Sequence, residues 1–351
     1  MNTVFRAALA GALVAGMATA ATTVATTDAS AAEVTLRVQH FISNKGAIPA
    51  NFILPWADKV EKDSGGRIDV EVYPRMQLGG KPPALYDQAR DGVIDIGWAI
   101  PAYTPGRFPG TETLELPFIG TNSAEKTSMA AWEFFEKYLK DEFSDTHILA
   151  VHVHGPGIMH FRGDPVDTLA GMEGKKMRTP SRLGGKMLEA AGAVPVGMPV
   201  PAFPEALSKG VVDGGVIPWE IVVPLKVHEL ADSHVVMGGD NPWYNTFFVY
   251  VMNKNSYESL PDDLKKVIDD NSGMMASAWA GRAMEQGDAP SLAIVEGTDN
   301  TIVTLSDEET AKWKANGDKV TAEWVAEMTE KGYPAQQMVD DLKAMMAKHN
   351  Q

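Results

Sequence analysis

The sequence predicts an α/β protein built as two lobes. Its 351 residues exceed the about 250–300 residues that a single hydrophobic core usually supports. Strands alternate with helices in two separate blocks of the chain, which is typical of α/β lobes. The apolar share of 44% and the charged share of 22% are those of a globular protein with a sizeable core.

The first block runs strand, helix, strand, helix, strand. The expected strands are residues 34–39, 68–73 and 94–98, and the expected helices are residues 51–63 and 81–90. This order predicts a parallel sheet, and open parallel sheets bind ligands beyond the carboxyl ends of their strands. We therefore expect residues 41–44 and 98–103 to line a site.

A second block repeats this order further along the chain. Its expected strands are residues 148–154, 175–179 and 212–218, and its expected helices are residues 182–191 and 203–209. Residues 246–253 form a long apolar strand, and residues 261–285 read as one long helix. This strand and this helix could bridge the two lobes. From Asp307 to its end the chain is expected to form amphipathic helix.

The N-terminal segment predicts a signal peptide at residues 1–32. Arg6 precedes an apolar run at residues 7–20, which is shorter than the about 20 residues needed to span a bilayer. Ala29-Ser30-Ala31 then has the small-residue pattern of a signal peptidase site. Export of the mature protein is therefore expected, and an uncleaved anchor is the alternative.

Charge and composition exclude several kinds of partner and chemistry. The net charge of −15 argues against nucleic acid or an anionic membrane surface as a partner. The chain has no cysteine, so it has no disulfide, thiol nucleophile or cysteine-bound metal. An anionic small ligand is still compatible with this charge, because distant surface charges are screened within about 8 Å.

Common enzyme motifs are absent from the sequence. It has no phosphate-binding loop, dinucleotide fingerprint, zinc-protease helix or nucleophile elbow. His152 and His154 occupy alternate strand positions and so share one face, where two imidazoles could hold zinc. No acidic residue at ligand spacing accompanies them, so we expect no metal and no cofactor. A secreted metallohydrolase is the alternative from another functional class.

The most specific pattern lies between Asp164 and Pro218. Its conspicuous stretches are Gly-Lys-Lys-Met-Arg-Thr-Pro at 174–180, Ala-Gly-Ala-Val-Pro-Val-Gly-Met-Pro at 191–199 and Ala-Leu-Ser-Lys-Gly-Val-Val-Asp-Gly at 206–214. In this order they closely resemble the substrate-binding subunits of tripartite ATP-independent periplasmic (TRAP) transporters. Leu-Pro-Phe at 116–118 and the stretch at 257–261 extend the resemblance over nearly the whole mature chain.

The resemblance implies a periplasmic solute-binding protein and no enzyme. The family fold is a type II-like periplasmic binding protein fold, with a cleft between two lobes and a long helix that spans them. We expect lobe I over residues 33–154 and 244–285, and lobe II over residues 155–243 and 286–351. The lobes close on a small organic carboxylate, and the closed protein is presented to the membrane subunits of a permease. A sensory role for the same subunit is not distinguished from transport.

Arg178 falls on the arginine that, in this family, forms a bidentate salt bridge with the ligand carboxylate. A planar guanidinium matches two carboxylate oxygens and stays charged at any working pH. Other pocket positions depart from the family pattern. Ile217 stands where many members carry asparagine, Ile100 occupies a position that is polar in some, and residues 154–161 lack a second arginine.

Apolar and aromatic side chains replace those polar groups, and they favour an aromatic, benzoate-type monocarboxylate. The ligand classes kept as alternatives are hydroxy or keto acids, sugar acids and C4-dicarboxylates. Glu220 or Asn245 could accept a hydrogen bond from a ligand hydroxyl, and Glu220 could hold a cation. The expected ligand-binding residues are Arg178, Trp219, Glu220, Asn245, Phe41, Trp98, Tyr103, Met159 and Phe247.

Overall fold

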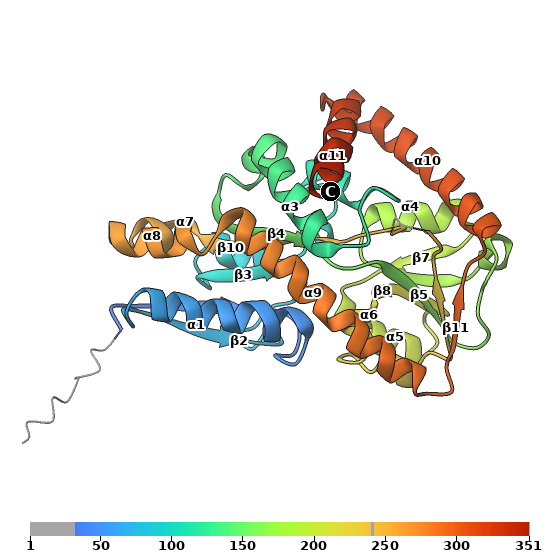
Figure 1. Cartoon of the computed structure of the whole chain (residues 1–351), viewed down its shortest axis with the longest axis horizontal. Coiled ribbons are helices and arrows are strands. Elements are labelled where there is room, and N and C mark those ends of the chain that lie inside the picture. The colour runs from blue at the N-terminus through green and yellow to red at the C-terminus, as the bar shows by residue number, and fades with distance from the viewer. Residues whose placement is uncertain (1–31, 240–241, 351) are drawn as a thin grey trace, which may run out of the picture. The chain divides into compact units, whose positions relative to one another are not determined.

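The computed structural model describes residues 32–239 and 242–350, so the predicted signal peptide lies outside the described residues except for Ala32. Two mixed sheets dominate the described chain (Figure 1). The strands of the first sheet are β1 (Val34–Gln39), β2 (Ile68–Tyr73), β3 (Ile96–Ala99), β4 (Thr146–Val153) and β10 (Phe247–Asn253). Their order across the sheet is β2-β1-β3-β10-β4.

The first sheet confirms the parallel arrangement expected for the first block. β1 pairs in parallel with both β2 and β3. β10 lies antiparallel between β3 and β4, with an irregularity in register between Tyr250 and Val251. All residues of β10 are buried, as is typical of a strand whose two faces are both covered.

The second sheet contains the remaining strands. They are β5 (Gly157–Phe161), β6 (Lys176–Thr179), β7 (Val194–Gly197), β8 (Gly214–Pro218), β9 (Ser233–Val236) and β11 (Thr301–Thr304). Their order is β11-β9-β5-β8-β6-β7. β6 pairs in parallel with β7 and β8, whereas β5 runs antiparallel to β8 and β9. The carboxyl ends of β6 and β8 therefore lie at the same edge.

Helices cover both sheets. They are α1 (Leu54–Asp63), α2 (Leu85–Arg90), α3 (Ala124–Phe134), α4 (Arg182–Ala190), α5 (Phe203–Ser208), α6 (Trp219–Val222), α7 (Lys254–Glu258), α8 (Asp262–Asp270), α9 (Gly273–Glu296), α10 (Asp307–Glu330) and α11 (Ala335–His349). Serine side chains cap several of them: Ser123 caps α3, Ser181 caps α4 and Ser306 caps α10. In the part of the chain that the structure describes, no helix is both long and apolar enough to cross a membrane.

The long helix α9 runs obliquely from the side of the first sheet to that of the second (Figure 1). It contacts α3 and β4 at one end and α6 near the other. The single helix expected over residues 261–285 was wrong in its bounds, because the chain breaks between α8 and α9. Gly273 adopts a φ of 79° there, a left-handed conformation that ends a helix and that glycine accommodates without strain.

The last helix, α11, packs against α3 on the first sheet although residues 286–351 were expected in lobe II. Contacts between Cα atoms do not divide residues 32–350 into separate units. The expected lobe boundaries therefore stay a prediction. The site is described below by the two sheets, whose strand ends carry its residues.

Candidate functional site

A small cavity of about 40 Å³ lies where strand ends of the two sheets meet. Small-molecule sites are concave and mostly apolar with a few polar groups, as is the lining of this pocket. Phe41 follows β1 and Ile100 follows β3, whereas Arg178 belongs to β6 and Glu220 follows β8. Carboxyl ends of strands are the expected position for ligands of parallel sheets.

Arg178 is the dominant charge of this pocket. Its Nε and Nη2 donate to the carbonyl oxygen of Met198 at 3.1 and 2.9 Å, and its Nη1 donates to that of Val216 at 2.8 Å. Only 2% of the residue is exposed, and burial lowers the pKa of the guanidinium from its usual range. No carboxylate of residues 32–239 and 242–350 pairs with it. A buried and unpaired cation of this kind favours an anionic ligand.

Flat aromatic rings form one wall of the pocket. The rings of Phe41 and Trp98 stack at 4.6 Å and 9°, and those of Trp98 and Phe248 stack at 5.0 Å and 3°. Trp98 Nε1 donates to His152 Nε2 at 2.8 Å, which fixes the plane of the indole. Stacking and this hydrogen bond hold the rings together as one wall, and a flat apolar body can pack against it.

Two tyrosines lie close to the guanidinium. The Tyr103 hydroxyl accepts the backbone N–H of Val200 at 2.9 Å, and the charge of Arg178 counteracts the burial that raises the pKa values of Tyr103 and Tyr244. Tyr244 packs over Gly157, where a Cβ atom would lie 1.7 Å from the ring. Glycine at the start of β5 is therefore required for Tyr244 to reach the pocket.

The other polar groups that line the pocket include His154 and Glu220. Burial lowers the pKa of His154 to about 4 and raises the pKa of Glu220 well above its usual value, which Asp288 raises further. His154 Nε2 and Glu220 Oε2 are both buried without a hydrogen-bond partner in the described part of the chain. The pocket therefore combines one cation with two buried polar groups that have no described partner.

The structure brings together many of the predicted site residues and leaves others apart. Those that line the pocket are Phe41, Trp98, Tyr103, Arg178 and Glu220, and the apolar Ile100 and Ile217 lie beside them. Those that lie elsewhere are Met159, Trp219, Asn245 and Phe247.

Each residue outside the pocket has a clear position. Met159 is fully buried within β5, and Trp219 packs edge-on against His160. Asn245 lies against Gly120, where a Cβ would meet its amide nitrogen. Phe247 points into the core and its neighbour Phe248 faces the pocket, because successive side chains of a strand point to opposite faces.

Several pocket residues were not predicted as ligand contacts. They include Tyr244, Thr246, Phe248, Met284 and His154. Thr246 and Phe248 share one face of the strand at 246–253, because alternate side chains of a strand point the same way, but this apolar run does not show which face meets the pocket. No sequence pattern distinguishes Met284, which reaches the pocket only because α9 crosses it.

The geometry around the two histidines does not favour the zinc site kept as an alternative. Trp98 already occupies the Nε2 lone pair of His152. His154 Nδ1 lies 2.5 Å from the carbonyl oxygen of Gly155. Within residues 32–239 and 242–350, no group of three or more His, Asp or Glu side chains is arranged to hold a metal ion.

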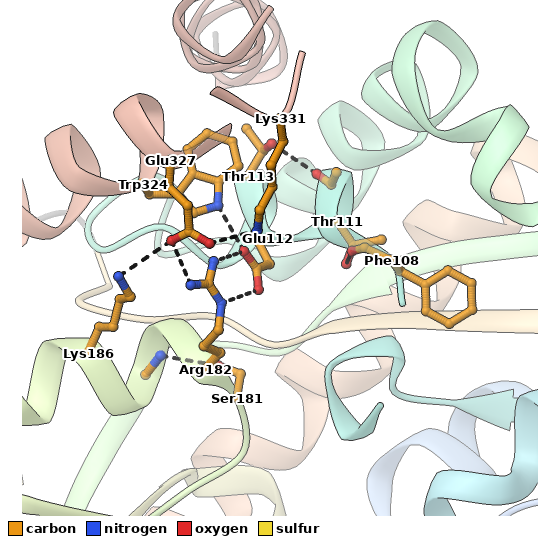
Figure 2. Close-up of polar contacts among 12 residues, drawn as sticks. Phe108, Thr111, Glu112, Thr113, Ser181, Arg182, Lys186, Trp324, Glu327 and Lys331 are labelled. Carbon is orange, nitrogen blue, oxygen red and sulfur yellow. Dashed lines mark hydrogen bonds and ion pairs between the residues drawn. The ribbon is translucent and has the colours of Figure 1, made fainter. Parts of the chain in front are cut away.

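An ionic cluster lies just beyond the end of β6 (Figure 2). Arg182, the first residue of α4, donates from Nε to Glu112 at 2.8 Å and from Nη1 to Glu327 of α10 at 2.8 Å. Trp324 Nε1 donates to the same Glu112 carboxylate at 2.9 Å. Glu112 belongs to the short helix Pro109–Glu115 after β3, so the cluster ties a loop of the first sheet to helices of the second.

Comparison with known proteins identifies the family to which this chain is similar. Residues 41–328 match the family model described as bacterial extracellular solute-binding protein, family 7. The C4-dicarboxylate-binding periplasmic protein of Rhodobacter capsulatus is 27% identical over 312 residues, which are 87% of this chain and 90% of that protein.

Two solved structures are more similar in sequence. A TRAP solute-binding protein from Rhodoferax ferrireducens T118, in complex with copurified benzoate, is 46% identical; the match covers 90% of this chain and 98% of that one, with a TM-score of 0.88. A marine metagenome TRAP solute-binding protein specific for aromatic acid ligands, co-crystallised with 3-hydroxybenzoate, is 42% identical; the match covers 92% and 100%, with a TM-score of 0.89.

Proposed function

The chain belongs to the bacterial extracellular solute-binding proteins of family 7, and from that premise we propose that it captures an aromatic monocarboxylate for import by a TRAP permease. The observation that carries the proposal is Arg178, a buried cation without a carboxylate partner in the described chain, set beside a wall of stacked rings. Similar proteins bound to benzoate and to 3-hydroxybenzoate support it.

Arg178 would bind the ligand carboxylate. A guanidinium donates five N–H groups, and three hydrogen bonds to carbonyl oxygens leave N–H groups for an anion. Because these partners are neutral, the full positive charge remains for the ligand. The bidentate geometry of guanidinium and carboxylate then orients the ligand.

Phe41, Trp98 and Tyr103 would contact the body of the ligand. An aromatic ring placed there gains about 25 cal/mol per Å² of apolar surface removed from water. Ring stacking adds about 0.5–1.5 kcal/mol for each good pair. Arg178 is the only Lys or Arg among the described residues that line the pocket. A second ligand carboxylate would thus be desolvated without a cation, which favours monoacids over C4-dicarboxylates.

Proteins of this family act in the periplasm, and the predicted signal peptide at 1–32 would bring this one there. We place the hinge between the predicted lobes, at 33–154 with 244–285 and at 155–243 with 286–351. The closed, loaded protein would then dock on the membrane subunits of its permease. Capture of this kind uses binding and closure alone, so no catalytic residue is assigned.

Thermal unfolding tests the proposal against each alternative ligand class. Benzoate should raise the melting temperature of the mature protein, because a ligand at a hundredfold excess over Kd adds about 2.7 kcal/mol to stability. Malate, pyruvate and galacturonate, which represent the alternative classes, should raise it much less at the same concentration. A larger rise with any of these three than with benzoate would contradict the proposed ligand class.

A further inference from the structure

Two buried polar groups of the pocket, on His154 and Glu220, indicate more about the ligand. This inference rests on the proposed function and refines the class of ligand. His154 follows β4 directly and lines the pocket. Its Nδ1 lies 2.5 Å from the carbonyl oxygen of Gly155, and a carbonyl oxygen only accepts, so Nδ1 carries the hydrogen. The pKa of about 4 keeps the ring neutral near pH 7, and Nε2 is then a hydrogen-bond acceptor.

This acceptor has nothing to accept from within the described residues. His154 is 2% exposed, and its Nε2 is buried without a partner. The ring is held edge-on against Tyr244 and Phe248, at 5.3 and 6.1 Å between ring centroids. Both neighbouring rings also line the pocket, so their packing holds the His154 ring in one orientation at the pocket wall.

Glu220 supplies the complementary group. It is 5% exposed and lines the pocket, and its Oε2 is also buried without a described partner. Burial and the nearby Asp288 raise its pKa well above the usual value, which favours the protonated carboxyl. A protonated carboxyl offers an O–H donor as well as an acceptor.

Asp288 of α9 lies beside the two chain segments that carry these groups. Its Oδ1 accepts the backbone N–H of Glu220 at 2.9 Å. Its Oδ2 lies against Gly155, the residue after His154, where a Cβ would approach that oxygen to 2.2 Å. Asp288 therefore lies beside the backbone of Glu220 and that of the residue after His154.

We propose that the pocket selects aromatic monocarboxylates that carry a hydroxyl group, with the hydroxyl donating to His154 Nε2 and accepting from the Glu220 carboxyl. A hydroxyl both donates and accepts, so it matches this pair of groups. An unsubstituted or methyl-substituted ring would leave both groups buried and unpaired. Sites with buried polar groups of this kind discriminate strongly against analogues that lack the hydroxyl.

Matched ligand pairs test this inference by calorimetric titration. Each hydroxybenzoate isomer is compared with the methylbenzoate of the same substitution, which has a similar size and no hydroxyl. We expect at least one isomer to bind tenfold or more tightly than its methyl analogue. In His154→Phe that ratio should fall below threefold, and a thermal unfolding midpoint near that of the wild type would show that the variant is folded.

Two further variants complete the test. His154→Gln offers an amide oxygen as acceptor and should keep more of the preference than His154→Phe. His147→Phe, at a histidine that stacks on Tyr257 away from the pocket, should keep all of it. The inference would be overturned if every hydroxybenzoate isomer bound the wild type less than three times as tightly as its methyl analogue. It would also be overturned if the preference for the hydroxyl were unchanged in His154→Phe. If neither benzoate nor any of its derivatives bound, the proposed function would fail with it.

Discussion

Arg178 shows how a single side chain can prepare a site for an anion. Its partners are the carbonyl oxygens of Met198 and Val216, which hold the guanidinium in place without neutralising it. A carboxylate partner would have held it equally well and cancelled its charge. The protein thus keeps a desolvated positive charge, at an energetic cost that the proposed carboxylate ligand would offset.

Arg178→Ala should weaken binding of benzoate-type acids by about 2–5 kcal/mol, the usual loss when one partner of a buried charge pair is removed. Arg178→Lys should restore little, because an ammonium group has no fork of parallel donors. Calorimetric titration measures both, and Arg67→Ala, which removes an arginine from a surface ion pair, is the control. An alanine variant that binds within threefold of the wild type would contradict the role given to Arg178.

Glu115 should make stability depend on pH. It is 3% exposed, and burial raises its pKa from 4.5 to about 8. Between these values the native carboxyl keeps its proton while the unfolded one loses it, so the unfolding free energy falls as pH rises. Through this one group, the free energy of unfolding changes by at most about 1.4 kcal/mol per pH unit.

Glu115→Gln removes this contribution. The unfolding free energy of the variant, relative to the wild type, should therefore rise by about 2–4 kcal/mol from pH 5 to pH 8. Urea unfolding across this range measures the difference, with the exposed Glu296→Gln as control. Parallel stability curves for the Glu115 variant and the wild type would show that Glu115 ionises normally.

Residue types at the site were easier to predict than their orientation. The family motif placed Arg178, and strand ends placed Phe41, Trp98 and Tyr103 at the pocket. The sequence predicted Phe247 as a ligand contact, whereas Phe248 lines the pocket. Neighbouring strand residues point to opposite faces, and a strand buried on both faces has no alternation of polar and apolar residues to show which face meets the pocket. The tautomer of His154 depends on the Gly155 carbonyl, which only the fold brings into contact.

At the scale of elements, the close packing of α9 on α3 depends on a glycine. A Cβ on Gly281 would lie 2.4 Å from the carbonyl oxygen of Ala124 and 2.5 Å from Ser128 Oγ. Ser128 cannot move freely, because its Oγ accepts the backbone N–H of Val153 at 3.1 Å. The helix that links the two sheets is thereby held against the end of β4, next to the pocket.

Alanine at two helical glycines should therefore have opposite effects. Gly281→Ala should destabilise the protein by about 1–3 kcal/mol through overpacking. Gly185→Ala in α4 should stabilise it by up to about 1 kcal/mol, because its nearest atom, Pro195 Cβ, would lie at an ordinary 3.6 Å. Urea unfolding of both variants measures the difference. Equal effects of the two substitutions would contradict the close contact between α3 and α9.

Element types were predicted well, whereas their breaks and long-range pairing were not. Strand and helix periodicity identified most elements of both blocks. The break at Gly273 was missed because the apolar pattern continues across it from α8 into α9. The insertion of β10 between β3 and β4 joins residues about 150 and about 100 positions apart in the chain, and no local pattern specifies such a pairing.

At the scale of the whole molecule, the burial of the pocket implies movement. Arg178, His154 and Glu220 are each at most 5% exposed, so a ligand cannot reach them in this conformation. The elements around them come from both sheets, and the cluster of Glu112, Arg182 and Glu327 ties the same two sides together outside the pocket (Figure 2). Separation of the sheets would open both.

Ligand binding should therefore shift the protein from open to closed forms and reduce its radius of gyration. Small-angle scattering of the mature protein, with and without saturating benzoate, measures this change. Arg178→Ala at the same benzoate concentration should keep the ligand-free value. Identical scattering curves for the wild type with and without bound ligand would indicate a rigid pocket.

Selectivity between monoacids and diacids tests the central claim most directly. The pocket offers one cation and an aromatic wall, so benzoate should gain from both while succinate, fumarate and malate would each bury a second, unpaired carboxylate. In competition calorimetry benzoate-type acids should bind at least tenfold more tightly than these diacids, a difference of about 1.4 kcal/mol or more. A C4-dicarboxylate that displaced benzoate at equal or lower concentration would contradict the account.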